Sequence, residues 1–235
     1  MSIPPISEGK SRLMLVEGPD DVLFFAKLTE HLERSSPESF DFTKFETLPF
    51  GGAQQLVSSL ELLARDPRYD QVSHIGIVRD SDYNTDAFAS VCNAIARFNS
   101  QPPTSHLPLP TEVFTPTQEQ PHVSILTMPL KADGTLESVV LSALDDDEIV
   151  PCVNGYFNCI EEVDPNADFS QSRLPKSKLA VLIAGKSTDR NKANVPDVKR
   201  RLLHNVYGMT WLPVDFWERE PFDDAKAFLH QLLAD

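Results

Sequence analysis

Short apolar runs alternate with segments of helical periodicity over the first 145 residues of the chain. The apolar runs have the length and composition of buried strands and cover residues 12–16, 42–50, 74–78 and 122–128. Apolar residues recur at helical spacing in residues 20–34, 53–65, 84–98 and 137–144. This alternation predicts an α/β fold in which four parallel strands form one sheet that is flanked by helices.

The chain divides by pattern into two parts. Residues 101–121 contain six prolines and little periodicity, which predicts an irregular excursion, and the strand that follows it belongs to the same sheet. After residue 145 the pattern is mostly helical, with helices expected at 150–162, 176–185, 197–206 and 222–233. We therefore expect an α/β domain at 1–145 and a mainly helical C-terminal extension at 146–235 packed on it.

Cysteine usage and hydropathy indicate the compartment. The three cysteines, Cys92, Cys152 and Cys159, form no CxxC pair, so neither a disulfide framework nor a zinc ribbon is expected. The N-terminus lacks an apolar core of signal-peptide length, and no stretch reaches the roughly 18 apolar residues of a membrane span. A soluble cytoplasmic protein is expected.

Acidic residues follow three of the predicted strands. Glu17 and Asp21 come after the first strand, Asp80 and Asp82 after the third, and Glu137 after the fourth. Ligands in open α/β sheets gather at the carboxyl edge of the strands, so these side chains are expected to converge there. Residues i and i+2 of a strand end share one side of the pleat, and carboxylate oxygens suit Mg²⁺. The sequence predicts a Mg²⁺ or Mn²⁺ site.

The order of these motifs resembles that of the TOPRIM superfamily. The chain carries VEGPDD at residues 16–21, a Gly51-Gly52 turn, the DxD of Asp80 and Asp82, Met128-Pro129, and the GxLE at residues 134–137. In that order they are similar to stand-alone TOPRIM proteins related to the nucleases of the overcoming-lysogenisation-defect type. The resemblance covers roughly residues 11–145, and it implies a TOPRIM-like Rossmannoid sheet.

The resemblance also implies roles for single residues. Glu17 would be a metal ligand or the general acid/base, Asp80 and Asp82 would be metal ligands, and Asp21 and Glu137 would be further ligands or would hold the ligands in place. The related nucleases have a lysine after the acidic motifs. By chain order this is Lys178, with Lys176 and then Lys186 as alternatives, because no local motif fixes the register.

A basic stretch lies inside an acidic chain. The net charge is −14, yet residues 173–201 hold nine basic residues and only two acidic ones. Such a stretch either covers solvated helix faces or contacts phosphate. The nucleic-acid-binding residues that we predict are Lys176, Lys178, Lys186, Arg190, Arg200 and Arg201.

Other catalytic classes find no support in the sequence. Residues 184–188 imitate the end of a P-loop, but its first glycine would fall at Ala180, and the histidines form no HExxH pair. Two function classes stay open. One is a Mg²⁺-dependent nuclease or phosphotransferase that acts on nucleic-acid phosphodiesters. The other is a non-catalytic module that binds metal or nucleic acid as a sensor or as the subunit of a protein partner. A third interpretation is an unrelated doubly wound domain with accidental motifs.

Overall fold

Four parallel strands form the centre of the molecule. The computed structural model describes residues 3–36, 40–81, 86–101, 106–130, 132–164, 169, 173–186 and 212–234. The four strands form one parallel sheet, as the sequence predicted, and they pair in the order β2-β1-β3-β4. Their bounds are Arg12–Val16 (β1), Phe45–Pro49 (β2), His74–Asp80 (β3) and His122–Met128 (β4).

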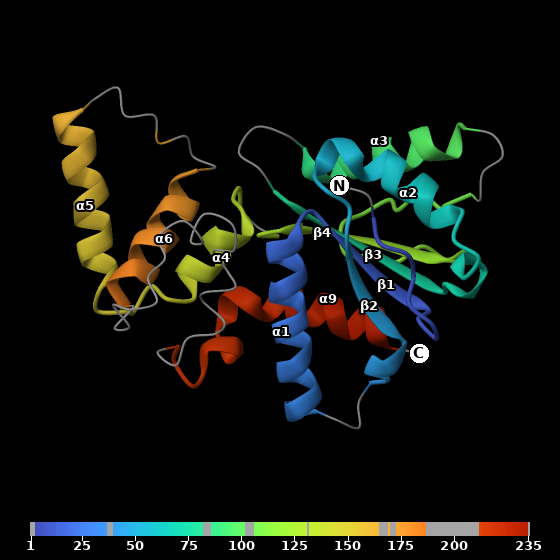
Figure 1. Cartoon of the computed structure of the whole chain (residues 1–235), viewed down its shortest axis with the longest axis horizontal. Coiled ribbons are helices and arrows are strands. Elements are labelled where there is room, and N and C mark those ends of the chain that lie inside the picture. Colours follow the sequence, from blue (N-terminus) through green and yellow to red (C-terminus); the bar gives the residue numbers. More distant parts are fainter. Residues whose placement is uncertain are drawn as a thin grey trace.

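Helices cover both faces of this sheet (Figure 1). On one face lie α2 (Leu56–Ala64) and α3 (Ala87–Asn99). On the other face lie α1 (Pro19–Ser35) and the C-terminal α9 (Asp223–Leu233). Right-handed crossovers explain the two layers, because the chain moves in opposite directions along the sheet before and after β2.

Three further helices lie beyond the carboxyl ends of the strands. They are α4 (Leu136–Ser142), α5 (Val150–Val163) and α6 (Leu174–Lys186), and Figure 1 shows α5 farthest from the sheet. Single turns of 3₁₀-helix complete the described elements: Phe42–Lys44, Ala53–Gln55, Tyr69–Gln71, Phe216–Glu218 and Glu220–Phe222.

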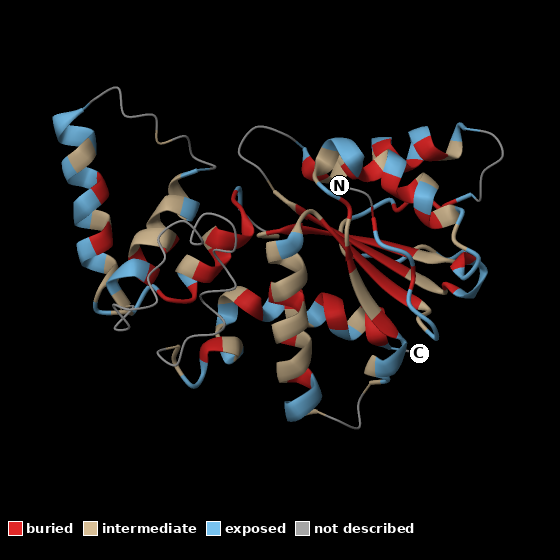
Figure 2. Cartoon of the chain, viewed as in Figure 1, coloured by how far each residue is buried: buried red, intermediate tan, exposed pale blue. Residues whose placement is uncertain are grey.

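Two clusters of buried side chains hold the layers together, and β1, β3 and β4 are buried along most of their length, whereas the edge strand β2 is only partly buried (Figure 2). Alternate strand residues point to opposite faces, so Leu13 and Leu15 join α2 and α3, while Met14 and Val16 join α1 and α9. The cluster that contains Met14 and Val16 also contains apolar residues of α4, α5 and α6. The helices after residue 145 therefore share a core with the sheet.

Local hydrogen bonds explain where two elements start later than the sequence pattern predicted. Asp41 accepts a hydrogen bond from Thr43 N at 3.1 Å, which holds residues 42–44 in a 3₁₀ turn before β2 begins. Asp86 caps α3 by accepting a bond from Ala89 N at 2.9 Å.

The helix expected at 197–206 lies outside the described residues. Within the described part, no helix is both long and apolar enough to cross a membrane.

Candidate functional site

The strand order places the switch point of the sheet between β1 and β3. After β1 the chain moves to β2 on one side and then returns to β3 on the other side. In open α/β sheets, ligands bind at the carboxyl ends of the two strands where the direction changes in this way. Glu17 follows β1 directly and Asp80 is the last residue of β3, so both lie at this switch point.

The glycine turn after β2 fixes the backbone of Glu17. The carbonyl oxygen of Glu17 accepts hydrogen bonds from Gly51 N and Gly52 N, both at 3.0 Å. Both glycines have positive φ, 84° and 100°, a region that other residues rarely adopt. The Gly51-Gly52 motif is thus a turn former, and its amides bind the chain itself.

Glu17 also contacts a buried arginine that the sequence interpretation missed. Arg79 Nε lies 3.3 Å from Glu17 Oε1, and only 8% of the Arg79 side chain is exposed. Arg79 Nη1 in addition donates to Ser90 Oγ on α3. The available signal was a charged residue within an otherwise apolar strand, directly before Asp80.

Asp21 lies in the first turn of α1 and faces the same region. Its Oδ2 accepts a hydrogen bond from Gly18 N at 2.8 Å, so it caps the helix. Burial, followed by the nearby charges of Glu17 and Glu137, raises the pKa of Asp21 to about 7, although the bond from Gly18 opposes the shift. Burial and the neighbouring negative charges make ionisation of Asp21 costly, and a cation bound beside it would offset this cost.

Asp80 connects the end of β3 to the start of α4. Its Oδ1 accepts a hydrogen bond from Leu136 N at 3.0 Å. Burial raises the pKa of Asp80 well above its usual value, and the charges of Asp21, Glu17 and Glu137 add to this. Asp80 therefore lies within electrostatic range of the other three carboxyl groups.

The GxLE motif brings Glu137 to this position. A Cβ at Gly134 would lie 3.1 Å from Pro129 Cδ, so glycine lets the segment pack closely on the residue after β4. Thr135 is the N-cap residue of α4, and Glu137 lies in the first turn with about 6% of its surface exposed. We call Glu17, Asp21, Asp80 and Glu137 the carboxylate cluster.

Lys176 of α6 is the lysine that approaches the carboxylate cluster. Its Nζ lies 3.6 Å from Glu137 Oε1. Burial alone would lower the pKa of Lys176, but the negative charges of Glu137, Asp80 and Asp21 outweigh it and raise the pKa. Lys176 was the second choice for the lysine by chain order, and the geometry favours it over Lys178.

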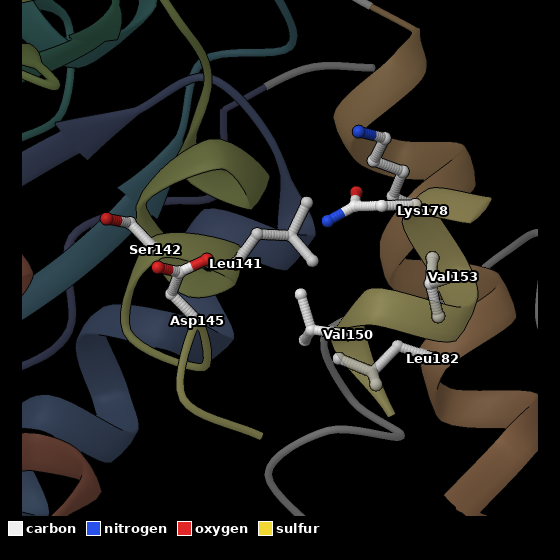
Figure 3. Close-up of a pocket in the computed structure, with 8 residues that line it drawn as sticks. Leu141, Ser142, Asp145, Val150, Val153, Lys178 and Leu182 are labelled. Atoms are coloured by element: carbon white, nitrogen blue, oxygen red, sulfur yellow. The ribbon is translucent and has the colours of Figure 1, made fainter. Parts of the chain in front are cut away.

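Lys178 lies elsewhere, in a cavity of about 380 Å³ between α4, α5 and α6. In Figure 3, Leu141 of α4 and Leu182 of α6 extend into this space from opposite sides. Asp145 and Asn154 supply further polar lining. A second, more open hollow of about 520 Å³ lies beside Ser81 and Thr127 at the carboxyl ends of β3 and β4.

Lys186 is engaged in a different contact. Its Nζ lies 2.7 Å from Asp147 Oδ2, and both side chains are largely buried. Asp147 also accepts a bond from Ile149 N at 2.9 Å, while Asp146 pairs with Arg219. Asp146 and Asp147 therefore stabilise the turn between α4 and α5. Asp82, Arg190, Arg200 and Arg201 lie outside the described residues, and their predicted roles stay predictions.

The donor set suits a divalent cation in chemical type. Oxygen ligands alone, all carboxylates, are what Mg²⁺ and Mn²⁺ take in proteins. Within the described residues, however, no three Asp, Glu, His or Cys side chains already stand together as a metal-binding group. Each member of the carboxylate cluster instead contacts a protein group, and Arg79 and Lys176 supply positive charge. Cation binding would require these side chains to turn toward one ion.

The fold and this site define an α/β protein with an acid-rich carboxyl edge. The chain belongs to the DUF3226 family, described as a protein of unknown function, whose family model matches residues 11–204. That match includes all four strands, the carboxylate cluster and α4 to α6. Searches of curated proteins and of solved structures gave no significant match.

Proposed function

We propose that this protein is a divalent-metal-dependent nuclease or phosphotransferase of the TOPRIM type that acts on nucleic-acid phosphodiesters. One observation carries the proposal: carboxyl groups from three separate segments lie within electrostatic range of one another at the carboxyl edge of the sheet, and the pKa values of Asp21 and Asp80 are raised. Such crowding costs folding free energy, and it is typical of sites whose charge is balanced by a ligand.

The proposed roles follow from position. Asp80, Asp21 and Glu137 would hold the cation together with Asp82. A bound Mg²⁺ or Mn²⁺ would supply charge stabilisation and would lower the pKa of a coordinated water. Glu17, whose backbone is fixed by the glycine turn and whose carboxylate is oriented by Arg79, would accept the proton of the attacking water. Lys176 would bind a phosphate oxygen, since it is half exposed beside the cluster.

Nucleic acid could approach along the open side of the site. The hollow beside Ser81 and Thr127 lies at the carboxyl ends of β3 and β4, and β3 also borders the switch point. Lys178 is two residues further along α6, so it points to a different side of the helix and lines the α4–α6 cavity instead. Lys176, together with the basic residues of 187–201, would neutralise phosphates in a protein whose net charge is −14.

The non-catalytic alternative is also supported by a specific observation. Glu17 and Glu137 lie beside Arg79 and Lys176, so part of the negative charge is already balanced within the chain. A module that binds metal or nucleic acid as a sensor, or within a larger assembly, would need no more than this. Turnover by the purified protein decides between the two.

The test is cleavage of single-stranded and nicked DNA and RNA by purified protein with Mg²⁺ or Mn²⁺. We expect cleavage that stops on chelation and that Glu17→Gln lowers by about 10²- to 10⁴-fold, the range of a positioned proton-transfer group. Glu33→Gln is the matched control, since Glu33 is exposed and lies near the C-terminus of α1, at the opposite end of that helix from Asp21. Full activity of Glu17→Gln would assign cleavage to another site, and an inactive wild type that still binds metal would favour the non-catalytic module.

A further inference from the structure

Helix α5 carries an apolar stripe on its outer side. Cys152 and Cys159 are both exposed, 52% of Tyr156 is exposed, and 80% of Val163 is exposed. These four residues are spaced by four, three and four positions. At 3.6 residues per turn they fall within about 60° of the helix circumference. We call Cys152, Tyr156, Cys159 and Val163 the α5 stripe.

The inner side of α5 is packed in an ordinary way. Val153 and Phe157 are buried in the same cluster as Leu179, Leu182 and Ile183 of α6. The stripe therefore does not serve to attach α5 to α6. Spacing of four and three residues is the pattern of a helix-pairing seam, in which apolar positions recur every 3.5 residues on average.

Open space lies next to this stripe. A Cβ built at Gly155 would have nothing within 4 Å, and Gly155 is exposed in the middle of the helix. A helix-interior glycine costs about 1 kcal/mol relative to alanine, and packing within the chain does not require it here. A bare backbone at this point permits another helix to approach closely. In Figure 1, α5 stands at one end of the described structure, farther from the sheet than the other helices.

We propose that the α5 stripe binds the same stripe of a second copy of this chain, with the two helices antiparallel. A two-fold axis near residues 157 and 158 would match every member of the stripe with another, Cys152 with Val163 and Tyr156 with Cys159. Such an interface is self-complementary, as two-fold symmetry demands. Beyond the proposed function at the sheet edge, it assigns the chain a partner, which is itself.

Charge decides the direction of the helices. The charged residues of α5 are Glu161 and Glu162, both acidic and both near its C-terminus. A parallel pair would place each beside its own copy. In the antiparallel pair Glu161 faces Asn154 of the second copy, and the two Glu161 residues are offset by about 10 Å along the axis, roughly the screening length of physiological salt. The two helix dipoles are also antiparallel, which is the favourable arrangement for neighbouring helices.

The size of the surface predicts a weak dimer. A helix of 14 residues is about 21 Å long, so a single helix pair lies at the small end of specific interfaces, below about 1,200 Å². Reversible association in the micromolar range or weaker is expected. Chemical cross-linking can capture a complex of this kind.

The cysteines of the stripe make the test direct. In the antiparallel pair the two Cys159 residues are offset by about 4.5 Å along the axis, and the two Cys152 residues by about 16 Å. Full-length Cys152→Ser protein should therefore form a covalent dimer with a short bis-maleimide, and Cys159→Ser should not. The double serine variant, which keeps only Cys92, measures the background. Equal cross-linking by both single variants, or none above background, would overturn the proposal.

A second measurement does not depend on cysteine chemistry. Sedimentation of the wild type over increasing concentration should show a reversible monomer–dimer equilibrium. Tyr156→Glu should weaken it at least tenfold because it places a charge in the seam. Asn158→Glu adds the same charge on an exposed position about 130° away on the helix and should leave it unchanged. Equal effects of both variants, or a monomer at all concentrations, would rule the interface out. Neither outcome depends on nuclease activity.

Discussion

Single residues at the strand ends serve both the fold and the site. Asp21 caps α1 through Gly18, Asp80 binds the first turn of α4 through Leu136, and Glu17 anchors the glycine turn through its carbonyl group. Their carboxyl groups nevertheless remain close enough to raise the pKa of two of them. The contacts that position these acids thus also maintain their mutual repulsion.

The raised pKa of Asp21 predicts a pH dependence of stability. Because the folded protein holds this proton up to about pH 7 and the unfolded chain releases it near pH 4, stability from this group falls as pH rises between these values and then levels off. Asp21→Asn keeps an acceptor for Gly18 N and removes the titration. In chelator, the free energy of unfolding of Asp21→Asn relative to wild type should rise by on the order of 2–4 kcal/mol from pH 4 to pH 8. Urea unfolding at several pH values measures it, and a constant difference would contradict the assignment.

The contact between Arg79 and Glu17 predicts coupling between the two residues. Arg79→Met leaves the partly buried carboxylate of Glu17 without this cation and should cost about 1–3 kcal/mol, less than a fully buried pair because a quarter of Glu17 is exposed. In a double-mutant cycle, Glu17→Gln should cost less stability in the Arg79→Met protein than in the wild type, and the difference should be about 1 kcal/mol or more. Additive losses would mean that Arg79 acts through Ser90 and packing alone.

At the scale of elements, the C-terminal helix completes the sheet. Four buried side chains of α9, Phe228, Leu229, Leu232 and Leu233, belong to the core beneath β1 and β3. Arg12 of β1 donates to the carbonyl oxygens of Leu232 and Ala234, at 3.2 and 2.5 Å, and so satisfies the end of the helix. A segment more than 200 residues away in sequence thereby covers one face of the first strand.

Gly76 of β3 sets the distance between the sheet and α9. A Cβ at this position would lie 3.0 Å from Phe228 Cε1 and 3.1 Å from Leu232 Cδ2, so Gly76→Ala should destabilise the protein by about 1–3 kcal/mol. Gly185→Ala is the control: its Cβ would meet Ile149 at an ordinary 3.6 Å, and alanine should be neutral or stabilising by up to about 1 kcal/mol in α6. Thermal and urea unfolding measure both. Adding Phe228→Leu should recover part of the loss in Gly76→Ala, and no recovery would place the strain elsewhere.

At the scale of the whole molecule, the carboxyl edge joins the sheet to the α4–α6 layer. Glu17 and Asp80 come from the sheet, Asp21 from α1, Glu137 from α4, and Lys176 from α6. A ligand that neutralises this region would therefore connect both parts of the structure. Its binding should be visible in global unfolding.

Metal binding to the carboxylate cluster predicts a rise in the melting temperature. At a free Mg²⁺ or Mn²⁺ concentration ten times the dissociation constant, linkage adds about 1.4 kcal/mol, or roughly 3–6 °C for a chain of this size. Asp80→Asn keeps the bond from Leu136 N but lacks the charge, so it should abolish the rise. Asp146→Asn is the control: it removes an exposed acid that pairs with Arg219, and the rise in melting temperature with metal should persist in this variant. An unchanged melting temperature of the wild type at millimolar metal would count against the site.

The sequence by itself determined the sheet and the order of its elements. Period-two and period-3.6 apolar patterns are local, and the length of each run fixes its type, so strands at 12–16 and 122–128 coincide with β1 and β4. Motifs at strand ends could also be placed at the carboxyl edge, because the parallel topology requires it. Glu17, Asp21, Asp80 and Glu137 were all found in this way.

Only the tertiary structure decided which charges meet there. Chain order favoured Lys178, but α6 turns Lys176 toward Glu137 and Lys178 toward a separate cavity, since the rotation of a helix depends on its packing against α4 and α5. Arg79 lies in a strand whose pattern says nothing of its partner, and its contact with Glu17 comes from the pairing of β1 with β3. Sequence periodicity fixes which face of an element is apolar, whereas the meeting of two charged side chains depends on contacts between elements far apart in the chain.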